Sequence, residues 1–64
     1  MNKQERHRRI LTLIANDLKI VDIAETLGVH RVTVQKDLRA MLDSKLLEKK
    51  GYQLTKKAKD LLEA

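Results

Sequence analysis

The sequence contains no cysteine, which excludes disulfide bonds and metal sites built on thiolates. No run of apolar residues approaches the ~18 that a membrane-spanning helix needs. The charged start, MNKQERHRR, is not followed by an apolar stretch long enough for a secretion signal. We therefore expect a soluble, cytoplasmic protein with no membrane partner.

The residues that support catalysis are also scarce. Ser44 is the only serine, no motif places a base beside it, and there is no glycine-rich phosphate loop. The two histidines, His7 and His30, are not spaced as a metal-binding pair, and His7 reads as part of a charged helix end. We predict no enzymatic activity, no cofactor and no metal site, and no small-molecule effector site is evident.

An excess of basic over acidic side chains is the feature of the composition that points to a partner. Fourteen lysines and arginines face nine acidic residues, for a net charge of +5 and a pI near 9.8. In a small domain this balance favours a polyanionic partner, with a solvated surface of mixed charge as the alternative. The excess is largest in residues 30–50, where six basic side chains stand against three acidic ones.

The 64 residues leave room for one small domain, residues 1–64, with a single core. Apolar residues at helical spacing predict helices over residues 3–17 and 31–44, and a last helix that Thr55 caps. A shorter helix is predicted over residues 23–27, with Asp22 as its N-cap and Glu25 completing a capping box. Gly28 is expected to end this helix in a left-handed conformation.

Two segments predict β-structure. The β-branched residues at 19–21 suit a short strand, which could pair with a later hairpin. Residues 46–54 predict a hairpin, with strands over 46–49 and 52–54, a tight turn at Lys50–Gly51, and Tyr52 packing the hairpin onto the core. The predicted fold is mainly α with a small β-hairpin.

Residues 20–42, IVDIAETLGVHRVTVQKDLRAML, combine a short capped helix, a glycine turn and a second amphipathic helix. Ala24 is small where the two helices must cross closely. This spacing is typical of a helix-turn-helix, whose second helix lies in the major groove of DNA.

Three stretches together resemble the DeoR-type winged helix-turn-helix: RHRRILTLI, VDIAETLGVHRVTVQKDL and LLEKKGYQLT. The family pattern runs Ile-Ala-x-x-Leu-Gly-Val-Ser and then Thr-Ile-Arg-Arg-Asp-Leu, where this chain has TVQKDL at residues 33–38. His30 replaces the capping serine, and Gln35 and Lys36 replace two arginines, so we expect a different sequence preference. The resemblance implies a winged helix-turn-helix that binds double-stranded DNA as a transcription regulator, associated with the nucleoid when bound.

The outer face of helix 31–44 is the candidate DNA interface, because it is basic and carries an amide. Arginine and lysine suit guanine, glutamine suits adenine, and valine suits the methyl group of thymine. The hairpin over residues 46–54, which is the wing, is expected to contact the DNA backbone beside the groove. Arg8 or Arg9, in the helix over residues 3–17, would hold the DNA phosphates. The candidate residues are His30, Arg31, Val32, Thr33, Gln35, Lys36, Arg39, Lys49, Lys50, Arg8 and Arg9.

Two other functions stay open. Winged helices also serve as protein–protein interaction modules within larger complexes, and an apolar outer face would favour that role. RNA binding usually requires exposed aromatic residues, and Tyr52 is the only aromatic residue in the chain. Many DNA-binding regulators of this kind act as dimers, so a homodimer is a further option, although no dimerisation helix is evident.

Overall fold

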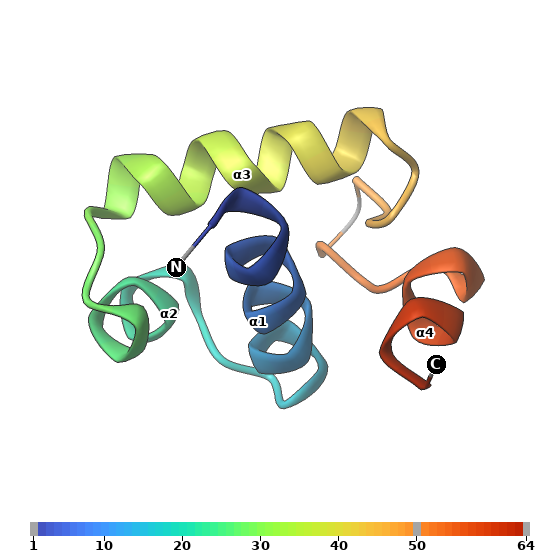
Figure 1. The fold of residues 1–64 in the computed structure, drawn as a ribbon, viewed down its shortest axis with the longest axis horizontal. Coiled ribbons are helices and arrows are strands. Elements are labelled where there is room, and N and C mark those ends of the chain that lie inside the picture. The colour runs from blue at the N-terminus through green and yellow to red at the C-terminus, as the bar shows by residue number, and fades with distance from the viewer. Residues whose placement is uncertain (1, 50, 64) are drawn as a thin grey trace.

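A computed structural model describes residues 2–49 and 51–63, which form four helices (Figure 1). Helix α1 spans Lys3–Ala15, α2 spans Ile20–Leu27, α3 spans Arg31–Asp43 and α4 spans Lys56–Glu63. Helix α1 is the central element, because it packs against each of the other three. Helix α3 crosses α1 and also packs against α2, while α2 and α4 flank α1 on opposite sides (Figure 1).

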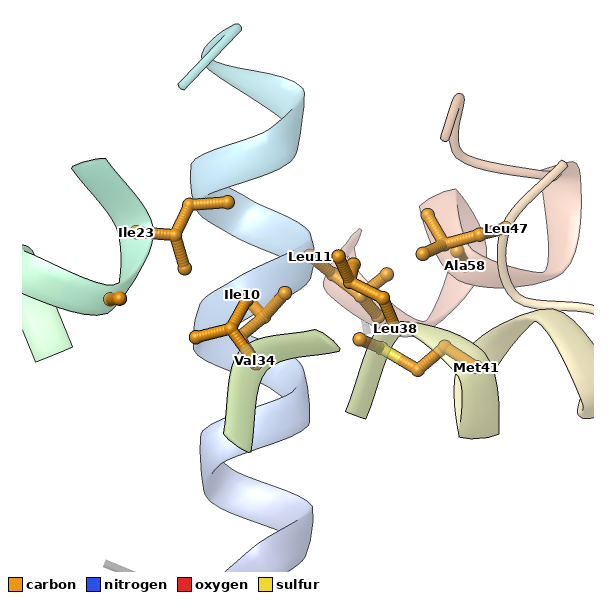
Figure 2. Packing of buried hydrophobic residues seen from close by; sticks show 9 residues of the cluster. Ile10, Leu11, Ile23, Val34, Leu38, Met41, Leu47 and Ala58 are labelled. Carbon is orange, nitrogen blue, oxygen red and sulfur yellow. The ribbon is translucent and has the colours of Figure 1, made fainter. Parts of the chain in front are cut away.

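The core is apolar and draws on all four helices and on the loop after α3 (Figure 2). Each α3 residue in it belongs to the helical stripe that the sequence predicts to face inward. Full burial of a valine, leucine, isoleucine or methionine side chain stabilises a fold by about 1.5–3 kcal/mol. The buried apolar residues are Ile10, Leu11, Ile23, Ala24, Val34, Leu38, Met41, Leu47 and Ala58.

The predicted strand over residues 19–21 is wrong, because Ile20 and Val21 form the first turn of α2. Lys19 is the N-cap and makes no side-chain cap hydrogen bond, so the capping box predicted from Asp22 does not form. The apolar residues at positions 20, 23, 24 and 27 recur at i, i+3, i+4 and i+7. Helix formation therefore places all four toward the core, and this burial outweighs the strand preference of β-branched side chains.

The predicted β-hairpin over residues 46–54 is also wrong, and with it the winged helix-turn-helix fold class. No strand forms in residues 2–49 and 51–63, where a single antiparallel bridge joins Leu47 to Leu54. Only two backbone hydrogen bonds flank it: Glu48 N–H donates to the Gln53 carbonyl at 2.7 Å, and Thr55 N–H donates to the Leu46 carbonyl at 3.1 Å.

The physical reason for this difference lies in the neighbours of the loop. A two-stranded ribbon is marginal by itself and usually needs a third strand. The segment expected to supply that strand is helical in α2. Leu46 and Leu47 also both pack on the core cluster, whereas a strand would point consecutive residues to opposite faces. Tyr52 does not join the core as predicted, since it is 37% exposed and has a φ of 49°.

The helix ends agree more closely with the sequence-based predictions. Gly28 ends α2 with a φ of 67°, as expected for a left-handed cap. Thr55 caps α4, because its hydroxyl oxygen accepts a hydrogen bond from the Ala58 N–H at 3.3 Å. Helix α1 ends two residues before the predicted Asp17, and α3 ends at Asp43 with Ser44 as its C-cap. Every helix in the described part of the chain is too short or too polar to cross a bilayer.

Candidate nucleic-acid interface

The outer face of α3 is a continuous row of exposed side chains. Residues three and four apart lie on one face of a helix, so positions 32, 35, 36, 39 and 43 share a face opposite the core stripe. The row carries two cations, one amide, one acid and one exposed valine, Val32, which is 51% exposed. Its members are Val32, Gln35, Lys36, Arg39 and Asp43. This arrangement presents hydrogen-bond donors along the length of the helix.

The start of α3 adds further polar groups to this face. His30 is the N-cap and is exposed, and its side chain makes no cap hydrogen bond. Arg31 is exposed beside it, whereas Thr33 is half-buried and its N–H donates to the His30 carbonyl at 3.0 Å. The sequence-based view of His30 as a weak cap is confirmed. Its imidazole and the Arg31 guanidinium are accordingly open to solvent at the end of α3.

The loop after α3 returns to the side of this helix. Lys49 and Lys45 line the same surface hollow as Arg39, with a volume of about 530 Å³. Asp43 and Glu48 line it as well, so the excess of positive charge there is small. The structure thus brings together Arg39 and Lys49, which the sequence predicts as site residues, and adds Lys45. The predicted contact by Lys50 lies outside the described residues.

Arg8 and Arg9 occupy a different part of the surface. Arg9 Nη2 lies 3.7 Å from Glu5 Oε1, one turn earlier on α1, and both side chains are exposed. Arg8 lines one hollow with residues of α4 and another with the end of α2, and Arg9 lines only the second. No α3 residue lines either hollow. The structure therefore does not place these two arginines beside the outer face of α3.

Sequence reasoning missed an ion cluster on the inner side of α3. Asp37 is 4% exposed and accepts hydrogen bonds from Arg6 and His7 of α1. Arg6 binds both carboxylate oxygens, through Nε to Oδ2 and through Nη2 to Oδ1 at 3.0 Å. His7 Nε2 lies 3.0 Å from Asp37 Oδ1, and its side chain is only 17% exposed. His7 is thus a partner of Asp37 and not merely part of a charged helix end.

The electrostatics of this cluster keep Asp37 ionised. Burial by itself raises the pKa of the Asp37 carboxyl, because it disfavours the charged form. The hydrogen bonds from Arg6 and His7, together with their charges, outweigh burial and hold the pKa of Asp37 below its ordinary value. The hydrogen bond to Asp37 in turn raises the pKa of Arg6.

A signal for this cluster was present in the sequence. Position 37 lies in the stripe formed by Val34, Leu38 and Met41, which are all buried. An acid in such a stripe requires a hydrogen-bonding cation, because an unpaired buried charge is strongly unfavourable. The basic start of α1 supplies these partners through Arg6 and His7, which are 31 and 30 residues away in sequence.

The described residues contain no group of three or more histidine, aspartate or glutamate side chains placed to hold a metal ion. Comparison with known proteins found no match to this chain among protein-family models, curated proteins or solved structures. The case for a function therefore rests on the surface of the molecule itself.

Proposed function

We propose that this protein binds double-stranded DNA through the outer face of α3, as the DNA-reading part of a transcription regulator. One observation carries this proposal: the exposed cations of α3 are not neutralised by acidic partners. None of the ion pairs in residues 2–49 and 51–63 involves Arg31, Lys36 or Arg39. These three side chains are therefore available to an external polyanion.

The dimensions of α3 suit the major groove. A helix of 13 residues is about 20 Å long, at about 1.5 Å per residue, and a groove about 12 Å wide admits it. Helix α2 packs against α3 across the Gly28 turn, in the order of a helix-turn-helix. Lys36 and Arg39 suit the acceptors of guanine, Gln35 suits adenine, and Val32 suits the thymine methyl group.

Phosphate contacts would fix the position of α3 in the groove without reading sequence. His30 and Arg31 serve one end of α3, and Lys45 and Lys49 serve the flank near its other end. The proposed surface leaves out Arg8 and Arg9, because the hollows that they line belong to α2 and α4. An interaction with another protein is less well supported, since Val32 is the single apolar residue on the α3 face.

The test is fluorescence anisotropy of a labelled duplex of random sequence, titrated with the protein at several salt concentrations. We expect micromolar binding that weakens as salt rises, because cations that neutralise phosphates release counterions. Lys49→Ala, at the flank assigned to phosphates, should weaken binding and reduce the slope of log K against log salt by about one.

Lys59→Ala is the matched control, since Lys59 is exposed on α4 and lines a hollow with Ala15 and Asp17 at the far end of α1. This variant should bind as the wild type does. An absence of binding even at low salt would reject the proposal and would favour a protein partner.

A further inference from the structure

The Asp37 cluster lies directly behind the candidate DNA-reading residues. Asp37 occupies the inner face of α3, one residue after Lys36 and two residues before Arg39. Its side chain points to α1, where it holds Arg6 and His7. The same short segment of α3 therefore carries the polar contact to α1 on one side and the proposed base-reading groups on the other.

The other contacts between α3 and the core are apolar. Val34, Leu38 and Met41 pack among aliphatic side chains, and such contacts favour burial without preferring one direction. An arginine that binds both oxygens of a carboxylate has a fixed geometry as well as a favourable energy. Among the described contacts of α3 with α1, the Arg6–Asp37 pair is thus the one with a fixed two-bond geometry.

We propose that Asp37 is a positioning residue for DNA recognition, acting through Arg6 and His7. The inference rests on the proposed DNA binding and adds a residue that touches no DNA itself. Asp37 sets the rotation of α3, and that rotation determines where Gln35, Lys36 and Arg39 meet the base edges.

The size of the effect follows from helix geometry. The tips of helix side chains lie about 5–6 Å from the axis, so a rotation of about 10° moves them by about 1 Å. Binding sites need their groups held to within about 0.5 Å of the productive position. A small rotation of α3 would therefore remove base contacts while leaving its positive charge near the phosphates.

Stability by itself gives little reason for this cluster. Replacing a buried ion pair by apolar residues is often neutral or stabilising, because both charges must be taken out of water. A directional ion pair instead selects one packing arrangement over others. In this protein, the Arg6–Asp37 pair would select one orientation of α3, and with it the direction of the outer face of α3.

The experiment compares two duplexes of equal length: a sequence that wild-type protein selects from a random pool, and a scrambled version of it. The readout is the ratio of the two affinities. A variant that is merely less stable has a smaller folded fraction, which weakens both affinities equally and leaves the ratio unchanged. Loss of positioning lowers affinity for the selected duplex alone, since binding to the scrambled duplex depends on charge.

Asp37→Asn should lower this ratio by roughly tenfold or more, on the scale of one lost base contact. Arg6→Lys should lower it as well, because lysine keeps the charge but lacks the planar fork that binds both oxygens. Arg6→Lys also keeps the test available if Asp37→Asn does not fold. Arg9→Lys is the matched control, because Arg9 lies on the same helix and pairs with Glu5 at the surface, and it should leave the ratio unchanged.

Each other outcome is decisive. If wild-type protein binds neither duplex, the proposed function fails and the positioning role fails with it. If wild-type protein binds both duplexes equally, DNA binding stands but Asp37 has no selectivity to set, and the inference is overturned. It is also overturned if the wild type discriminates and a folded Asp37→Asn or Arg6→Lys variant keeps the same ratio.

Discussion

Asp37 shows how a charged residue occupies a position that the helical pattern reserves for apolar ones. It sits in the stripe of Val34, Leu38 and Met41, and its carboxylate is satisfied by three hydrogen bonds from α1. Its partners are 31 and 30 residues away in sequence. The stripe could be predicted from spacing, but this pairing could not, because it depends on how α3 crosses α1.

The low pKa of Asp37 makes stability depend on pH. Because the folded pKa lies below the ordinary value near 3.9, the carboxylate contributes stability above about pH 4 and loses it as pH falls through the folded pKa. We expect Asp37→Asn to reduce the free energy of unfolding by about 1–3 kcal/mol at neutral pH. This difference should close in acid, where the wild-type carboxyl is protonated too.

Thermal unfolding followed by circular dichroism between pH 2 and 7 measures this difference, at roughly 4–8 °C per kcal/mol for a domain of this size. Asp60→Asn serves as a control, since Asp60 is exposed on α4 and its substitution should change the free energy of unfolding by less than about 0.5 kcal/mol. A gap between wild type and Asp37→Asn that stays constant across this pH range would contradict the role assigned to the carboxylate.

At the scale of single elements, the sequence predicts helices well where apolar spacing and helix ends agree. The α3 range differs from its prediction by one residue, and Thr55 caps α4 as expected. Helix α2 shows the limit, because the β-branched residues of its first turn locally favour a strand, whereas the apolar stripe that they complete favours the helix that forms. The hairpin prediction rested on residues 46–54 alone, and the segment that could have paired with this ribbon as a third strand is helix instead.

Thr55 connects the loop to α4 and provides a test at this scale. Its hydroxyl accepts from Ala58 N–H at 3.3 Å and donates to the Lys45 carbonyl at 2.7 Å. Thr55→Val keeps the shape but removes both bonds, so we expect a loss of about 1–2 kcal/mol in urea unfolding. Thr12→Val removes one hydroxyl bond on the exposed side of α1 and should change stability much less. Equal losses in both variants would show that Thr55 has no special capping role.

At the scale of the whole molecule, the α3 face could be predicted from the sequence, because one helix carries both its core stripe and its polar row. The relation of Arg8 and Arg9 to that face could not, since it depends on which side of α1 receives α3. Helix α1 directs Arg6 and His7 toward α3. The next two residues, Arg8 and Arg9, instead line hollows shared with α2 and α4. Neighbouring basic residues in one charged segment therefore have different surroundings.

The net charge of +5 leads to a prediction for the whole molecule. Salt screens repulsion among the protein's own charges, and it also weakens attraction to phosphates. Raising salt from about 50 to 200 mM should leave the melting temperature unchanged or slightly higher, while DNA affinity falls by about tenfold or more. Parallel thermal melts and anisotropy titrations check this. If both fall together, loss of folded protein explains the weaker binding and a DNA-phosphate contact is not supported.

Tyr52 gives the molecule an optical property. With no tryptophan and no phenylalanine, this one side chain accounts for all aromatic absorption and emission of the protein. It is partly exposed in the loop between α3 and α4, over a hollow lined by residues such as Leu18 and Leu38. Ultraviolet fluorescence therefore reports on a single loop, the one between α3 and α4, without any added label.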